Sequence, residues 1–343
     1  MSFVLALLAF GLLIAFHEFG HLVVALWAGM KVRRYSVGFG PVLVRRTIRG
    51  IPCELGAIPL GGFVEIAGLG GEEPDDVGAA SFQRRPVWAR LAAIAAGPAA
   101  NYLLALVIGT AVLSVRQVSL DPSSTILGDV VGGGPAATAG LREGDDVRAV
   151  GQRAVTTFEA LRAAVQAESK AHPGEPVPVA VVRAGQPMVV RVTPKDGLIG
   201  VTPHRRSEPG LPVVDAFRES AAHCVEATKN SVAMISSLVR RDTPVGALSG
   251  PVGIIGATAR EARRGFLDYL RIVGELSIAV GFFNLLPVPA LDGGRILIIT
   301  LETVSRRKLG ARVEGWINSA GFYGVVLLIL FVTWRDVGRL VGG

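Results

Sequence analysis

The chain has 343 residues, of which 50 % are hydrophobic and only 18 % are charged. Soluble domains carry about 25 % charged residues, so the composition argues against a purely soluble protein. The formal net charge is +7, but the Lys and Arg residues flank apolar runs instead of gathering on one polar domain. This distribution is typical of the cytoplasmic loops of membrane proteins and does not favour a nucleic-acid partner.

Four apolar stretches are long enough to cross a lipid bilayer, which takes about 20 helical residues. They cover residues 3–27, 91–115, 272–301 and 316–334. The first has no basic start and is too long for the apolar region of a signal peptide, so we expect it to be retained as a span. The third contains prolines, glycines and an aspartate, which predicts a helix that is broken inside the membrane.

The segments that follow the first and third spans, residues 28–90 and 306–312, are rich in Lys and Arg. Because such loops stay in the cytoplasm, we expect both to be cytoplasmic, and both termini and residues 116–270 to be external. Within the first loop, residues 35–66 alternate apolar residues with Gly-rich turns. This pattern predicts a membrane-associated β-hairpin loop, covered by protein wherever it reaches membrane depth.

The long external segment has the pattern of a small α+β domain followed by a helix. Short β-rich runs between residues 126 and 201 flank a stretch with helical periodicity at 157–168. An amphipathic pattern at 213–241 predicts a helix outside the bilayer. The predicted organisation has four regions: 1–115 with two spans and the β-loop (about 28–90), 116–205 with the α+β domain, 206–268 with the external helix and a linker, and 269–343 with the last two spans.

Residues 17–21 have the sequence His-Glu-Phe-Gly-His and match the pattern H-E-x-x-H. On a helix His17 and His21 share one face, so both imidazoles can reach one metal ion, and Glu18 can take a proton from the attacking water. The pattern also occurs by chance on soluble helices. Within an apolar span, however, ionisable groups are costly unless they are paired or ligated, which favours a metal site. Its position predicts a site nearer the cytoplasmic face.

A catalytic zinc ion takes three protein ligands and leaves one position open, and the strongest candidate for the third ligand is Asp292. It is the only carboxylate deep within the third apolar stretch, where two prolines and two glycines allow the backbone to turn inward. The alternative is a helix cap, which does not explain a carboxylate within an apolar span. Asn284, two turns earlier, could bind the substrate backbone or could equally satisfy carbonyls of its own broken helix.

Together these segments resemble the site-2 proteases, specifically the bacterial regulator-of-sigma-E protease group with a PDZ domain, over nearly the whole chain. Segment 17–21 is similar to the metal motif of the family's first span. Segment 284–294, Asn-Leu-Leu-Pro-Val-Pro-Ala-Leu-Asp-Gly-Gly, is similar to the motif of its third span. Further similarity to family signatures lies at residues 97–105 and 249–254, and residues 133–155 resemble a single PDZ module.

The resemblance implies a zinc ion bound by His17, His21 and Asp292, with Glu18 as the general base. It also implies a contact surface for the substrate, because residues 56–68 look like the family's β-loop that dips into the membrane beside the site. An edge strand there would pair with an unwound transmembrane segment of the substrate. The residues assigned to this contact are Gly61, Gly62 and Phe63.

The function implied is that of an intramembrane zinc metalloendopeptidase of a bacterial inner membrane. After a site-1 protease has trimmed a single-span substrate, this enzyme would cleave the remaining span and release a cytosolic regulator such as an anti-sigma fragment; signal-peptide remnants are a second substrate class. The PDZ module could bind a peptide or act only as a cap or size filter. The alternative is a catalytically silent PDZ scaffold, which should have lost Glu18 or a ligand. A metal transporter should show internal repeats, and none is found.

Overall fold

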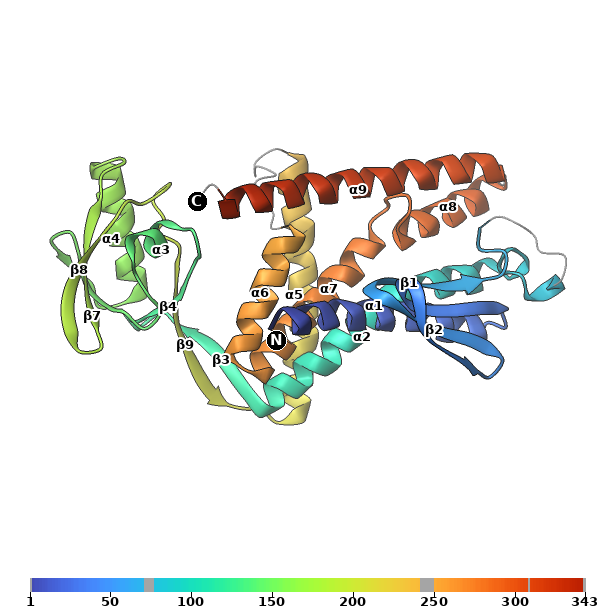
Figure 1. Ribbon diagram of the computed structural model, residues 1–343, viewed down its shortest axis with the longest axis horizontal. Helices are drawn as coiled ribbons and strands as arrows, with labels where there is room; N and C mark the ends of the chain where they lie inside the picture. The colour runs from blue at the N-terminus through green and yellow to red at the C-terminus, as the bar shows by residue number, and fades with distance from the viewer. Residues whose placement is uncertain (1, 71–76, 241–249, 308, 342–343) are drawn as a thin grey trace. The chain divides into compact units, whose positions relative to one another are not determined.

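The computed structural model describes residues 2–70, 77–240, 250–307 and 309–341 (Figure 1). The chain forms two compact units. One unit combines Met1–Ser114 with Leu211–Val337 and is mainly helical, whereas the other combines Val115–Gly210 with Gly338–Gly343 and is mixed α/β. Along the chain, the α/β unit is therefore inserted between two helical parts of the other unit.

Among the described residues of the helical unit, three helices are long and apolar enough to cross a membrane. They are α1 (Ser2–Trp27), α2 (Val87–Val115) and α9 (Ala311–Val341). Their apolar windows, Val4–Trp27, Val87–Val115 and Val313–Gly338, contain most or all of the first, second and fourth stretches predicted from the sequence. The chain thus has the helices of a membrane protein, by length and composition.

The third predicted stretch consists of two helices, α7 (Phe266–Leu285) and α8 (Asp292–Ser305), so the predicted interruption is observed. Prolines at 287 and 289 supply no backbone donors, which ends α7 before them. The two glycines that follow are required because carbonyl groups of the preceding segment lie against their Cα atoms. A Cβ on Gly293 would lie 2.2 Å from the carbonyl oxygen of Leu285, and one on Gly294 would lie 2.2 Å from that of Val288. The break therefore folds tightly onto the start of α8.

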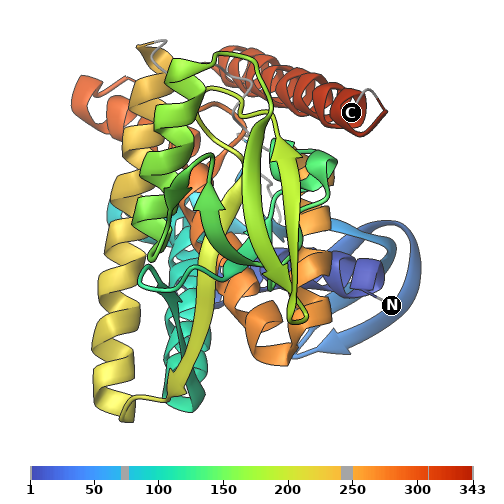
Figure 2. The ribbon, with the colours of Figure 1, turned by 90° about the vertical axis from the view of Figure 1, so that its left-hand side faces the viewer.

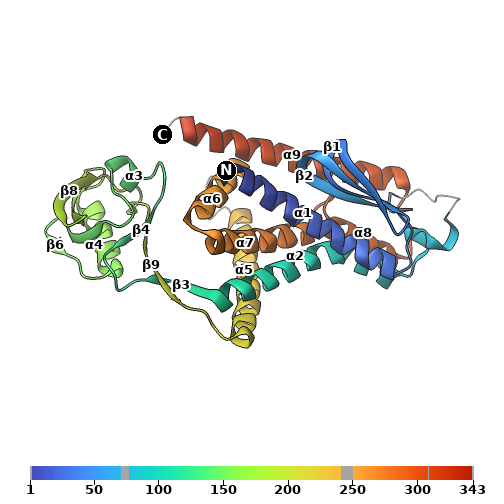
Figure 3. The same ribbon diagram turned by 60° about the horizontal axis from the view of Figure 1, so that its bottom comes forward.

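Helices α1, α2 and α7 lie side by side, and α5 (Val213–Val239) crosses them (Figures 1 and 3). The hydroxyl of Ser277 on α7 donates to the backbone oxygen of Asn101 on α2, at 2.8 Å. The region predicted as a linker after α5 contains a further helix, α6 (Pro251–Arg264), which packs against α1 and α7. Asp336 of α9 accepts hydrogen bonds from the amides of Gly250 and Gly253, so it caps α6.

The segment between α1 and α2 forms a long antiparallel hairpin of β1 (Val32–Ile48) and β2 (Ile51–Ile66). Residues 35–37 of β1 pair with residues 53–55 on one side and with residues 62–64 on the other. The segment 62–66 is therefore an outer edge of this small sheet. Two 3-10 helices follow, η1 (Gly78–Ala80) and η2 (Phe82–Arg84).

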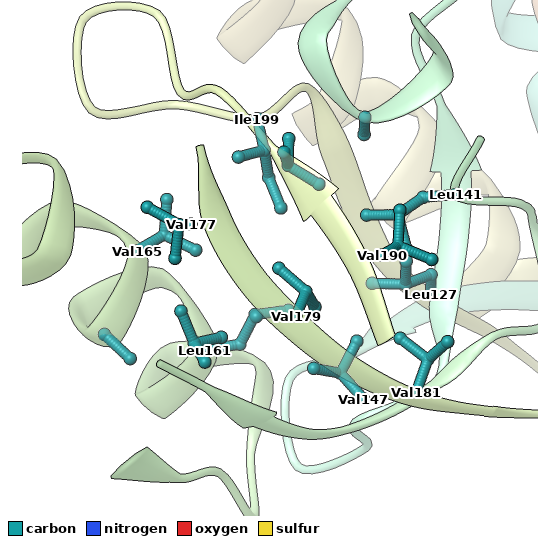
Figure 4. Packing of buried hydrophobic residues seen from close by; sticks show 14 of the residues in the cluster. Leu127, Leu141, Val147, Leu161, Val165, Val177, Val179, Val181, Val190 and Ile199 are labelled. Atoms are coloured by element: carbon teal, nitrogen blue, oxygen red, sulfur yellow. The ribbon is translucent and has the colours of Figure 1, made fainter. Parts of the chain in front are cut away.

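The α/β unit, whose strands run from green to yellow in Figure 2, contains two small sheets. Their strand orders are β3-β9-β4 and β6-β5-β7-β8. Its buried core combines side chains from strands of both sheets, from its two helices and from the segments between them (Figure 4). The core is rich in valine because a pleated strand suits branched side chains. The elements are β3 (Arg116–Asp121), β4 (Leu127–Val130), α3 (Pro135–Ala139), β5 (Asp146–Val150), β6 (Arg153–Ala154), α4 (Phe158–Ala171), β7 (Val177–Arg183), β8 (Gln186–Val192) and β9 (Val201–Pro209).

One buried ion pair ties the β5 end of this unit to β7. Asp145 is 1 % exposed, and its two carboxylate oxygens accept hydrogen bonds of 2.7 and 2.8 Å from the guanidinium of Arg183. The backbone amide of Arg142 donates a third, of 2.9 Å. Burial alone would raise the pKa of Asp145, but these hydrogen bonds outweigh burial and leave its pKa below the ordinary value.

Candidate metal centre

Two helices bring three possible metal ligands together. His17 and His21 lie one turn apart on α1 and are 6 % and 8 % exposed, and Asp292 is the first residue of α8. The Nε2 atoms of the two imidazoles are 3.2 Å apart. Oδ2 of Asp292 lies 3.0 Å from Nε2 of His17 and 3.4 Å from Nε2 of His21. The three residues therefore converge on one point, within 4.8 Å of one another.

The cluster offers lone pairs that a metal ion can share. His21 donates from Nδ1 to the carbonyl oxygen of Ala93, at 2.8 Å, which leaves Nε2 bare in the neutral ring. Among the described residues, Oδ2 of Asp292 has no hydrogen-bond partner although it is buried. Ligands held at 2.0–2.2 Å by one tetrahedral ion lie roughly 3.2–3.6 Å apart, close to the observed separations. Two imidazoles and a carboxylate thus fit a zinc ion.

Helix α2 forms the wall of this cluster. A Cβ on Gly97 would lie 2.3 Å from Nε2 of His21 and 2.7 Å from Nε2 of His17, so only a glycine leaves room for the two rings. The Ala93 carbonyl lies one turn before Gly97 and accepts from His21. Asn101 lies one turn after it, is completely buried, and places Nδ2 3.2 Å from Nδ1 of His17. One face of α2 therefore contacts both imidazoles.

Glu18 lies beside the outer edge of the hairpin. The backbone amide of Val64 donates a hydrogen bond to its carboxylate, and Gly62 of β2 packs against it, since a Cβ there would lie 3.2 Å from Cγ of Glu18. The two imidazoles and Asp292 are close enough to interact electrostatically with this carboxylate. The edge segment 62–66 thus borders the same site as the three possible ligands.

A tyrosine fixes the hairpin to α1. The hydroxyl of Tyr35 on β1 donates to the carbonyl oxygen of Ala15, at 2.9 Å, half a turn before His17. Burial, together with the nearby Glu18 carboxylate, raises the pKa of Tyr35 to about 12. The hydroxyl therefore keeps its proton at all physiological pH values and remains a donor.

The residues predicted to contact substrate occupy different positions. Gly61 has a φ of 114°, a value that favours glycine, and its Cα faces the ring of Phe39. The Phe63 ring stacks on Phe39 with centroids 6.5 Å apart. Asn284 donates from Nδ2 to the carbonyl oxygen of Val280, at 3.0 Å. In this structure it therefore binds a carbonyl of its own helix, one of the two roles that the sequence left open.

Sequence reasoning assigned no role to Gly97 or Asn101, although both belong to a segment that matched a family signature. The available signal was an amide side chain in the middle of an apolar span, where polar groups need partners. Asn101 carries this signal as Asn284 does, but it has no neighbouring ionisable residue or helix break to draw attention to it. Gly97 has no distinguishing signal in a helix that contains several small residues.

Comparison with known proteins gives a consistent result. The profile of Peptidase family M50 matches residues 5–329. A protein of Agrobacterium fabrum whose name describes a zinc metalloprotease is 31 % identical over 98 % of this chain and 95 % of its own length. The regulator of sigma-W protease RasP of Bacillus subtilis is 28 % identical over 97 % of both chains. The metalloprotease MmpA of Caulobacter vibrioides is 28 % identical over 97 % of this chain and 94 % of its own length.

A bundle of apolar helices that encloses two imidazoles, a carboxylate and a neighbouring glutamate defines a membrane protein of the metal-dependent hydrolase class. The chain belongs to peptidase family M50 and is a zinc-dependent metalloendopeptidase.

Proposed function

We propose that His17, His21 and Asp292 hold the catalytic zinc ion and that Glu18 is the general base for hydrolysis of a peptide bond within the membrane. The observation that carries this proposal is the convergence of three ligand atoms within 4.8 Å, beside a glutamate that contacts the edge of the hairpin. Zinc, when bound, supplies the Lewis acidity that activates water and polarises the scissile carbonyl.

Glu18 takes a proton from the attacking water and passes it to the amine nitrogen that leaves as the C–N bond breaks. The neighbouring edge segment holds the substrate. An extended peptide that adds to residues 62–66 lies beside Glu18, because the Val64 amide already reaches this carboxylate. We assign substrate contacts to Gly61, Gly62 and Phe63. We assign a further contact to Asn284, whose amide would exchange its hydrogen bond to the Val280 carbonyl for one to the substrate backbone.

The membrane arrangement we propose has four spans, with α7, residues 286–291 and α8 forming the broken third one. The amides of Val288 and Leu291 donate to carbonyl oxygens within the break, and that of Leu286 donates to Phe283 at the end of α7, which supports a backbone at membrane depth. Basic loops place the hairpin in the cytoplasm and both termini outside a bacterial inner membrane, with the site nearer the cytoplasmic face. The hairpin is membrane-associated, since it exposes Leu43, Val44 and Ile48.

The α/β unit we assign to the external side as a single PDZ module. A cavity of about 200 Å³ between α4 and residues 197–201 supports this assignment, because it is lined by the apolar residues Phe158, Leu161 and Ile199. Such a module either binds an extended peptide or limits the size of the external part of a substrate, and this unit can serve in either way.

The substrates we propose are single-span membrane proteins whose external part has been trimmed by a site-1 protease. A helix hides its backbone amides, so a span must unwind before it can pair with the hairpin edge. One relative is named a regulator of sigma-W protease, which supports a cytosolic regulator such as an anti-sigma fragment as the released product; signal-peptide remnants are a second substrate class. No nucleic acid takes part.

The test compares the full-length wild type with Glu18→Gln for zinc content and for cleavage of a trimmed single-span reporter. We expect about one zinc per chain in both proteins and a fall in cleavage of about 10²–10⁴-fold in Glu18→Gln, since general bases contribute factors of this size. Equal cleavage by both proteins contradicts the role of Glu18. Zinc without cleavage in either protein supports a silent scaffold, and a wild type without zinc contradicts the ligand assignment.

A further inference from the structure

Asn101 is a buried polar residue that the proposed chemistry does not use. It lies in the middle of α2, is 0 % exposed, and has an amide group that must be satisfied inside an apolar span. Its Nδ2 lies 3.2 Å from Nδ1 of His17. Its Oδ1 has no hydrogen-bond partner among the residues that the structure describes. The side chain is therefore directed at one of the imidazoles, with its stronger acceptor unused.

The protonation of His17 decides which amide atom must face it. A neutral imidazole carries one proton, so a ring that binds a metal through Nε2 carries the proton on Nδ1. This proton needs an acceptor, which an amide nitrogen cannot provide. A half-turn of the amide about its Cβ–Cγ bond places Oδ1 against Nδ1 without changing the volume occupied. The same turn gives the buried Oδ1 the partner that it lacks.

The second imidazole is held in the equivalent way. Nδ1 of His21 donates to the carbonyl oxygen of Ala93, at 2.8 Å. Ala93, Gly97 and Asn101 are spaced by four residues and so share one face of α2. One helix face thus offers an acceptor to each Nδ1, with a glycine between them where the rings come closest.

We propose that Asn101 is a positioning residue that accepts the Nδ1 proton of His17 through Oδ1 and thereby directs the bare Nε2 toward the metal. The hydroxyl of Ser277 holds the Asn101 backbone oxygen, at 2.8 Å, and so fixes the helix at this point. The proposal rests on the proposed role of His17 as a zinc ligand. Removal of such an outer hydrogen bond usually weakens metal binding by about 10–100-fold.

The experiment uses the full-length protein in detergent and four variants, titrated with Zn²⁺ against a chelator of known affinity. Asn101→Leu removes the acceptor at similar volume, and Asn101→Asp keeps an oxygen in its place. Thr110→Val is the matched control, because it removes a polar group from the same helix whose hydrogen bond stays within that helix. His17→Ala marks the effect of losing the ligand itself. Absorption spectra of the Co²⁺-loaded proteins report on the ligand geometry.

We expect Asn101→Leu to bind Zn²⁺ about 10–100-fold more weakly and to change the Co²⁺ spectrum, whereas Asn101→Asp and Thr110→Val stay within about threefold of the wild type. Unchanged zinc affinity in Asn101→Leu, with a loss in His17→Ala, overturns the inference alone. A loss in Asn101→Asp as large as that in Asn101→Leu also overturns it, because an acceptor is then not what His17 needs. A wild type that binds no zinc, or an unaffected His17→Ala, overturns the ligand assignment as well.

Discussion

Each unit holds a carboxylate that is shielded from solvent, Asp145 with 1 % exposure and Asp292 with 16 % side-chain exposure, and the surroundings of the two carboxylates differ. In the α/β unit, Asp145 faces a permanent cation and accepts three hydrogen bonds, from Arg183 and from the backbone of Arg142. In the helical unit, Asp292 faces the Nε2 atoms of two imidazoles, and its Oδ2 accepts no hydrogen bond from the described residues. The first carboxylate is satisfied by the protein alone, and the second is not.

This difference separates a structural role from a chemical one. When the fold itself neutralises a buried charge, the ion pair stabilises the fold or at least fixes the geometry around it. A buried charge surrounded by bare nitrogen atoms needs a cation from outside the chain, which a metal supplies. Burial of a carboxylate is therefore not informative by itself, and the kinds of atom that surround it decide its role.

The largest expected effect follows from exchanging the two carboxylates for amides, one at a time. Asp292→Asn should weaken zinc binding more than about 100-fold, because even the loss of an outer hydrogen bond costs 10–100-fold. Cleavage of a trimmed reporter should fall with it. Asp145→Asn is the control and should keep the zinc content of the wild type. Equal zinc binding by Asp292→Asn and the wild type would remove the contrast between the two carboxylates.

The space around the imidazoles can be tested without touching a ligand. Gly97→Ala places a methyl group 2.3 Å from Nε2 of His21, so the rings must move, and zinc binding should weaken by about 10-fold or more. Alanine favours helices over glycine by up to about 1 kcal/mol, so a weaker helix cannot explain the loss. Gly324→Ala on α9, where a Cβ meets open space, is the matched control. If both variants bind zinc equally well, α2 does not shape the site.

The site residues that could be predicted are those whose sequence pattern is local, and the residues that were missed depend on contacts between distant parts of the chain. His17, Glu18 and His21 follow a local helical spacing, and Asp292 stands out because a carboxylate is costly in an apolar span. The contact of Asn101 with His17 joins residues 84 positions apart on two apolar helices. No periodic pattern encodes which faces of two such helices meet, so this contact required the structure.

The fold shows the same limit. The apolar windows of α1, α2 and α9 are continuous, and composition was sufficient to predict them. Helix α6 was expected to be a linker, because residues 251–264 mix glycine, threonine and arginine with few large apolar residues. The double pairing of residues 35–37 could not be predicted either, since it places residues 53–55 and 62–64, which Gly61 with its positive φ separates along β2, on opposite sides of β1.

Removing the charge of Asp145 should destabilise the α/β unit alone. Asp145→Asn leaves an amide nitrogen facing donors, which costs about 2 kcal/mol for unsatisfied buried groups. Amides of β5 and β7 should then exchange hydrogen about 30-fold faster in the full-length protein. Asp196→Asn, an exposed change of the same kind, should leave this exchange unchanged. Faster exchange in α1 and α2 as well would show that Asp145 does not act within its own unit alone.

The smallest effect is a dependence on acid that belongs to the same unit. The pKa of Asp145 lies below its ordinary value in the folded state, so its stabilisation is complete above the unfolded pKa of about 3.9 and is lost as the pH falls through the folded pKa. The Ser123 hydroxyl, with neighbouring backbone amides, also lowers the pKa of Asp121, which titrates in the same range from an exposed position. Hydrogen exchange of β5 and β7, corrected for its intrinsic pH dependence, should therefore accelerate below about pH 4 in the wild type and in Asp292→Asn. Asp145→Asn should remove most of this acceleration, and Asp121→Asn should remove only a little of it. If Asp121→Asn removes more than Asp145→Asn, the acid sensitivity belongs to the exposed carboxylate and not to the buried ion pair.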